Sequence, residues 1–174
     1  MFGAADPEQA IAQLEAYYRE GRGERAEVMA SALVDQLMAK KDRDDVTQGI
    51  LVKGLRILAG VLNSREKYKR ARITIGLLHK HRSKHGKAVG HDLVTAAADY
   101  HLAGFIHSNA GKKGAAKKAF SKCEKLQPGH LAAALDAAEQ CGYAKTLAKL
   151  YPLAGPVISK NGAYILEIEN RPPA

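Results

Sequence analysis

The sequence predicts an all-α protein made of antiparallel helix pairs. Apolar residues recur at helical spacing over most of the 174 residues, whereas strand-like alternation appears only in the last fifteen. A pattern of helix, short break and helix occurs three times, at about 8–39, 47–82 and 91–127. We expect one domain over 1–174, in which capping helices and a tail at 130–174 follow the three pairs.

The first pair has a clear start and a clear break. Asp6 precedes Pro7, which is the arrangement of an N-cap and a first helical position. The apolar stripe that follows stops at residues 21–23, where glycines flank an arginine, and a second apolar stripe then continues to the charged run at 40–45. These signals predict a helical hairpin with a short turn.

The second and third pairs also consist of two apolar helical stripes separated by a short break. The second pair breaks at 63–64, and we expect the polar residues 79–90 to form the connection after it. The third pair breaks at 109–111 and ends before Pro128, because proline cannot continue a helix. Short helices are expected near 130–141 and 143–151. The segment from Pro156 onward fits a strand or a short helix, and we expect it to pack back on the helices.

The three pairs also repeat in their core residues. Ala26, Ala71 and Ala116 are 45 residues apart, and each lies early in the second helix of its pair. A small residue at this position lets two helices approach closely. One and two turns further along each second helix come the expected core positions Ala30, Ile75, Phe120, Leu33, Leu78 and Cys123.

These residues resemble the tetratricopeptide repeat family. The third pair resembles its motif at Tyr100, Gly104, Gly111, Ala116, Phe120 and Pro128. The first pair is similar at Tyr17, Gly21 and Ala26, and the second at Leu58, Tyr68 and Ala71. The resemblance implies a short right-handed solenoid whose stacked pairs present a concave groove, lined by the first helix of each pair.

The resemblance also implies which residues would line that groove and what it would bind. Carried over by position, the groove residues are Tyr18, Arg19, Lys53, Arg56, Asn63, His101, Phe105 and Asn109. Because the chain is basic, we expect an acidic or amphipathic segment of a partner protein to bind there. The resulting hypothesis is an adaptor or chaperone-like protein, for example in a bacterial secretion, pilus or motility assembly, and self-association is left open.

The charge distribution keeps a second function open. The net charge is +9, and the first fifty residues are acidic whereas the remainder is basic. Two stretches, 51–87 and 112–125, hold most of the lysines and arginines. Nucleic-acid binding through these stretches is the alternative hypothesis. No tryptophan is present, and each of the two basic stretches contains a single aromatic residue, so base stacking is not indicated.

We find no pattern typical of an enzyme, a metal site or a cofactor site. His81 and His85 are four residues apart, but lysines and an arginine surround them, which disfavours a bound cation. Cys123 and Cys141 fit a reducing compartment and packing roles. With no signal peptide and no long apolar run, we expect a cytoplasmic protein with no membrane partner. An unrecognised enzyme remains the third hypothesis.

Overall fold

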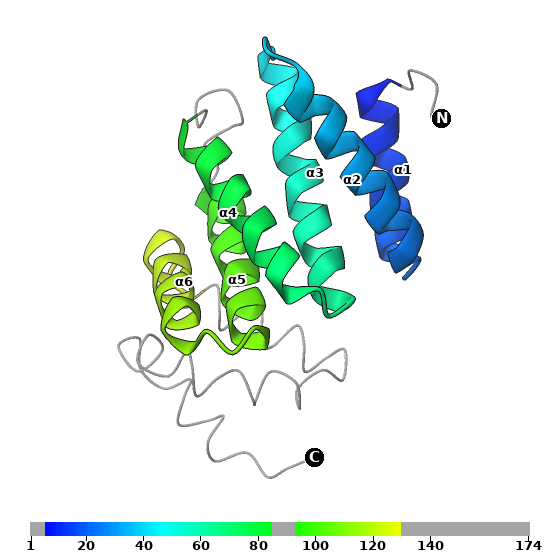
Figure 1. The fold of residues 1–174 in the computed structure, drawn as a ribbon. Helices are drawn as coiled ribbons and strands as arrows, with labels where there is room; N and C mark the ends of the chain where they lie inside the picture. The colour runs from blue at the N-terminus through cyan, green and yellow to red at the C-terminus, as the bar shows by residue number, and fades with distance from the viewer. Residues whose placement is uncertain (1–5, 85–92, 130–174) are drawn as a thin grey trace. The chain divides into compact units, whose positions relative to one another are not determined.

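The computed structural model describes residues 6–84 and 93–129, which are almost entirely helical (Figure 1). These ranges contain no strand, which confirms the all-α fold class. The chain divides into two compact units, Met1–His91 and Asp92–Ala174, and each is described by itself. The expectation of a single domain over 1–174 stays a prediction. The capping helices and tail expected at 130–174 lie outside the described residues.

The helices fall where the three pairs were expected. Their bounds are α1 Pro7–Arg19, α2 Gly23–Ala39, α3 Asp45–Ser64, α4 Tyr68–Lys84, α5 Leu93–Asn109 and α6 Lys113–Leu126. In unit 1, α1 packs on α2 and α3, α2 packs on α3, and α3 packs on α4 (Figure 1). In the described part of unit 2, α5 packs on α6.

Side chains close the ends of several helices. Asp6 Oδ1 accepts a hydrogen bond from the Glu8 N–H at 3.1 Å, and Asp44 Oδ1 accepts one from the Thr47 N–H at 2.7 Å. Both are N-caps, which satisfy backbone donors that a helix start leaves free. At the C-terminal end of α2, Arg43 Nη1 donates to the carbonyl oxygens of residues 37, 38 and 40, at 3.1, 3.3 and 2.8 Å.

The same turn geometry connects the two helices within each of the three helical hairpins. Gly21, Glu66 and Gly111 are 45 residues apart and have φ angles of 70°, 60° and 72°. In each turn the N–H of the next residue donates to the carbonyl oxygen five residues before it, at 3.0, 2.8 and 2.8 Å. This is the Schellman arrangement, in which a left-handed residue ends a helix. The repeat seen in the sequence is therefore present in the backbone.

The expected core face of each second helix is buried. Ala26, Ala71 and Ala116 are each 0% exposed, so the repeated alanines are core positions in all three hairpins. The six core positions expected further along these helices are also buried, namely Ala30, Ile75, Phe120, Leu33, Leu78 and Cys123. In unit 2, an added Cβ on Gly104 would lie 2.4 Å from the Phe120 ring, so α5 approaches α6 as closely as only glycine permits.

The expectation for residues 79–90 is wrong in its first part. Helix α4 continues to Lys84, and residues 85–90 lie outside the described residues. His81 and Arg82 are buried together with Leu78, because residues i, i+3 and i+4 share one face of a helix. His81 also has a polar partner in the interior, since its Nδ1 lies 3.0 Å from Gln48 Nε2 on α3.

Candidate functional site

A cleft with a volume of about 320 Å³ opens between α1 and α3 of unit 1, and we call it the α1–α3 cleft. Each helix contributes three lining residues, which are Glu15, Tyr18 and Arg19 from α1 and Lys53, Arg56 and Ile57 from α3. Both triplets have the spacing i, i+3 and i+4, so each triplet forms one face of its helix. The cleft is therefore made where two such faces meet.

The tyrosine lies against α3 at a glycine. A Cβ added to Gly60 would be 2.9 Å from the Tyr18 Oη and 3.5 Å from its Cζ, so a larger residue at position 60 would displace the ring. Tyr18 nevertheless keeps 45% of its surface exposed. Together with Ile57, it gives the cleft an apolar part that remains accessible to a ligand.

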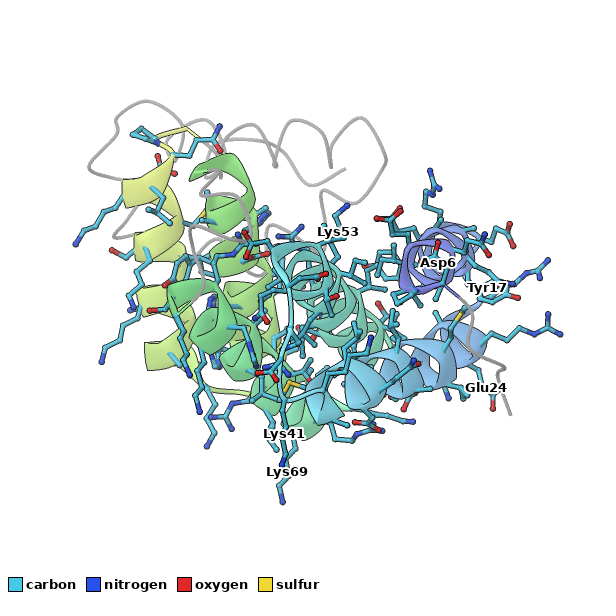
Figure 2. The ribbon with its side chains drawn as sticks, turned by 90° about the horizontal axis from the view of Figure 1, so that it is seen from above. Asp6, Tyr17, Glu24, Lys41, Lys53 and Lys69 are labelled. Atoms are coloured by element: carbon cyan, nitrogen blue, oxygen red, sulfur yellow. The ribbon has the colours of Figure 1, made fainter. Side chains whose placement is uncertain are left out.

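Basic groups outnumber acidic ones around this apolar part. Arg19, Lys53 and Arg56 line the cleft, against the single carboxylate of Glu15. Lys53 is exposed, and Figure 2 shows it on the opposite side of unit 1 from Lys41 and Lys69. Arg19 Nε donates to the Glu15 carbonyl oxygen at 3.4 Å, a local contact that leaves the guanidinium exposed. The cleft is suited to a ligand that carries negative charge beside an apolar group.

The structure brings four of the eight expected groove residues together in this cleft, namely Tyr18, Arg19, Lys53 and Arg56. Asn63 lies in the last turn of α3, where its carbonyl oxygen accepts the Glu66 N–H at 3.1 Å, and it does not line the cleft. Glu15 and Ile57 were not among the expected groove residues, although their helical spacing to Tyr18 and Lys53 could have identified them.

The other three expected groove residues lie on α5 in unit 2. The His101 ring centroid is 4.7 Å from that of Phe105 and 6.1 Å from that of Phe120. Phe105 meets Phe120 edge to face, with the centroids 5.7 Å apart. Asn109 is the last residue of α5 and is exposed. His101 and Phe105 thus contribute to the aromatic packing between α5 and α6.

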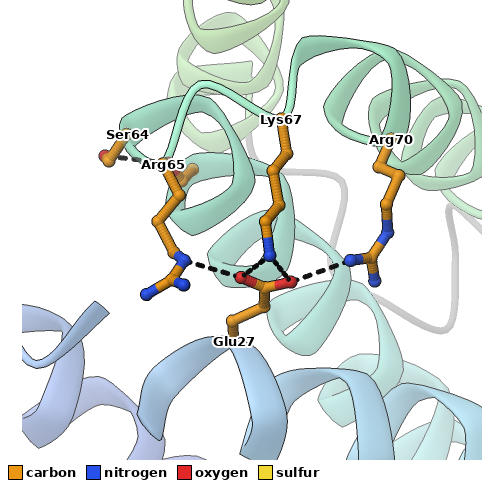
Figure 3. A network of polar contacts seen from close by, with 6 residues as sticks. Glu27, Ser64, Arg65, Lys67 and Arg70 are labelled. Atoms are coloured by element: carbon orange, nitrogen blue, oxygen red, sulfur yellow. Dashed lines mark hydrogen bonds and ion pairs between the residues drawn. The ribbon is translucent and has the colours of Figure 1, made fainter. Parts of the chain in front are cut away.

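Three cations of the basic stretch 51–87 converge on one carboxylate. Arg65 Nε is 2.7 Å from Glu27 Oε2, while Lys67 Nζ and Arg70 Nη1 each lie 2.8 Å from Oε1 (Figure 3). Glu27 belongs to α2, whereas the cations belong to α4 and the turn before it. This Glu27 cluster links the two hairpins of unit 1. Three cations of the basic stretch 51–87 are thus paired with a carboxylate of the same chain.

The protonation of Glu27 follows from these contacts. Burial alone would raise the pKa of the carboxyl group. The hydrogen bonds from Lys67 and Arg70, with the charges of Lys67 and Arg65, outweigh burial and hold the pKa below its ordinary value of 4.5. Glu27 is therefore ionised at neutral pH, which keeps the cluster intact.

The groups most suited to catalysis or metal binding have structural surroundings. Burial, with the nearby Glu124 carboxylate, raises the pKa of the Cys123 thiol to about 12, so the reactive thiolate is scarce at neutral pH. Within residues 6–84 and 93–129, no group of three His, Cys, Asp or Glu side chains could hold a metal ion. None of the helices in these ranges combines the length and the apolar character needed to cross a membrane.

Comparison with known proteins gives no assignment. No protein-family model, curated protein or solved structure matches the chain.

Proposed function

We propose that the protein is an interaction module whose α1–α3 cleft binds an acidic, amphipathic segment of a partner protein. The observation that carries the proposal is the composition of the cleft, in which Tyr18 and Ile57 lie among three basic side chains. Aromatic and arginine side chains contribute strongly to protein interfaces when they are desolvated together. Basic groups at the margin favour acidic partners and speed their association.

The ligand that fits best has two features. An apolar side chain would cover Tyr18 and Ile57, and carboxylates on either side would lie near Arg19, Lys53 and Arg56. A helix provides this pattern when its acidic residues are three or four positions from an apolar one. The module would then act as an adaptor or a chaperone-like protein that holds one segment of its partner.

We also propose that the helical hairpins are degenerate tetratricopeptide-like repeats. The support is local, and it consists of the turn repeated at 45-residue intervals with the buried alanine that follows it. The position of the cleft agrees with the groove that the resemblance implies, because both are formed by the first helices of successive pairs. The solenoid arrangement stays a prediction.

A peptide array tests the proposed binding. The full chain, fluorescently labelled, would be applied to 12-residue peptides in which net charge and apolar content vary independently. We expect retention only on peptides that have both acidic and apolar residues. Arg19→Glu combined with Lys53→Glu should abolish that retention.

The matched control is Lys41→Glu combined with Lys69→Glu. It makes the same change in net charge on the opposite side of unit 1 (Figure 2) and should leave binding intact. Equal loss in both double variants would contradict the proposal, because the charge would then act diffusely. Equal retention of apolar-free acidic peptides would also contradict it.

A further inference from the structure

The lysines of α6 form a second charged surface, which we call the α6 lysine face. It consists of the N-cap Lys112 and, on α6 itself, Lys113, Lys117, Lys118, Lys122 and Lys125, all of them exposed and together covering about half of the helix circumference. On the other side of the same helix, Ala116, Phe120 and Cys123 are buried against α5. The helix is about 20 Å long, at 1.5 Å per residue. Because these lysines are exposed, their positive charges are available to a partner in solution.

The acidic groups of this part of the chain do not offset that charge at the surface. Residues 93–129 contain two carboxylates, Asp99 and Glu124, which are 0% and 8% exposed. Glu124 Oε1 accepts the Gly129 N–H at 2.7 Å, so this oxygen is paired with a backbone donor that follows the C-terminal end of α6. The exposed charged side chains in the described part of unit 2 are consequently all lysines.

Repulsion among several of these lysines opposes formation of the helix that carries them. Lys113 and Lys117, like Lys118 and Lys122, are four residues apart on one helix, where like charges repel each other. Lys112 is the N-cap and makes no side-chain capping bond. Positive charge at this end of a helix opposes the helix dipole. Lys122 alone has an aromatic contact, with its Nζ 5.3 Å from the Tyr100 ring centroid.

The surroundings of the α6 lysine face distinguish between classes of anionic partner. Where burial is described, the exposed large hydrophobic residues lie between Tyr18 and Ile73, and none lies on α6 or at positions 96–109 of α5. A protein interface needs apolar anchors, and so does a helix that inserts into a membrane surface. A regular polyanion needs neither, because counterion release supplies the binding free energy.

We propose that the α6 lysine face binds the phosphate backbone of a nucleic-acid duplex without reading its base sequence. Lysine ammonium groups act as point charges toward phosphates, and α6 has no arginine, asparagine or glutamine for paired hydrogen bonds to base edges. The absence of an exposed aromatic ring from α6 favours a duplex over a single strand, which binds by base stacking. Affinity is accordingly weak and strongly dependent on salt.

Fluorescence anisotropy of the full chain with a labelled 20-base-pair DNA duplex tests this proposal. Binding at 50 mM salt should be indifferent to base sequence and should fall steeply as salt increases. The variant Lys113→Gln/Lys117→Gln/Lys118→Gln keeps helix-forming residues and removes three charges. We expect about 10- to 100-fold weaker binding at 50 mM salt, and a slope of log K against log salt that is smaller by about 2 to 3.

The control variant Lys41→Gln/Lys69→Gln/Lys80→Gln removes the same charge from exposed positions in unit 1. It should change the affinity less than threefold, and circular dichroism should show that both variants remain helical. Equal weakening in both variants would overturn the proposal, as would the absence of binding at 50 mM salt. Polyglutamate or phosphatidylserine vesicles of equal charge should compete poorly, and equal competition would assign the face to acidic protein or membrane instead.

Discussion

The α3–α4 hairpin and the α5–α6 hairpin share one backbone turn but are stabilised by different side-chain chemistry. Beside the first turn, three cations surround Glu27 at 2.7 to 2.8 Å. In the second hairpin, the Phe120 ring fills the space that Gly104 leaves open. A repeated backbone geometry thus places few demands on the residues around it, provided that the left-handed turn and the buried alanine are present.

The surfaces of the two units differ in a corresponding way. The α1–α3 cleft in unit 1 combines cations with Tyr18 and Ile57, whereas the α6 lysine face has cations and, among residues 96–129, no exposed large apolar side chain. Charge with apolar surface suits a protein segment, and charge without it suits a polyanion. The contrast explains why we propose different partners for two surfaces that are both basic.

The largest expected effect is at the shared alanine. Ala116→Arg would insert a long charged side chain where the native residue is 0% exposed, and it should lower the free energy of unfolding by about 3 to 5 kcal/mol. Ala71→Arg should have a similar effect in the α3–α4 hairpin, since Ala71 is equally buried. Thermal unfolding followed by circular dichroism provides the measurement. A melting temperature equal to that of the wild type in either variant would show that the alanines are not equivalent.

The next effect is confined to unit 1. Glu27→Gln removes the carboxylate charge that the cations share. Breaking a fully buried pair costs about 3 to 5 kcal/mol, but Arg65, Lys67 and Arg70 keep 33%, 41% and 55% of their side chains exposed. Solvent screening reduces the loss, so we expect about 1 to 2 kcal/mol in urea unfolding. A loss below about 0.3 kcal/mol would mean that the cluster contributes nothing beyond an ordinary surface pair.

The pH dependence separates this charge effect from packing. Because the pKa of Glu27 is below 4.5 in the folded chain, the unfolded state binds its proton first as the pH falls. The stabilisation is complete above about pH 4.5 and is lost as the pH falls through the folded pKa. The difference in stability between wild type and Glu27→Gln should therefore shrink below pH 4.5. A difference that stays constant down to pH 3 would assign the effect to packing.

The sequence predicted the elements that depend on local spacing. The helix bounds and the buried alanines follow from periodicity or from the 45-residue offset, whereas the four cleft residues were expected only from the resemblance to tetratricopeptide repeats. Helical spacing would also have identified Glu15 and Ile57, because each shares a helix face with cleft residues that were expected. Residues 79–84 were misassigned because a run of basic residues resembles a connection, although Leu78, His81 and Arg82 form a buried face.

Contacts between distant polar residues could not be predicted in this way. Glu27 and Lys67 are 40 positions apart, and Gln48 and His81 are 33 apart, with no periodic pattern that links them. Their pairing depends on how the hairpins pack, which is settled by the apolar core. The charge count of 51–87 likewise could not show that three of its cations meet Glu27 inside unit 1, whereas the lysines of 112–125 remain exposed.

The smallest effect concerns the turn itself. Glu66 has a φ of 60°, where the matching residues of the other two turns are glycines. Residues with a Cβ disfavour this conformation by about 1 to 2 kcal/mol, and part of that is offset by the greater freedom of glycine in the unfolded chain. Because the Glu66 side chain is exposed, Glu66→Gly should stabilise the protein by about 0.5 to 1 kcal/mol.

The reverse change in the other hairpin completes the test. A Cβ on Gly111 would meet no atom within 4 Å, so Gly111→Ala should destabilise the protein through the backbone alone, by about 1 kcal/mol. Urea unfolding should show opposite shifts of the midpoint for the two variants, with the m-value unchanged. If Glu66→Gly instead lowered the midpoint, the Glu66 side chain would contribute more to the α3–α4 turn than its backbone strain costs. The two turns would then share a φ angle but differ in the side-chain interactions that stabilise them.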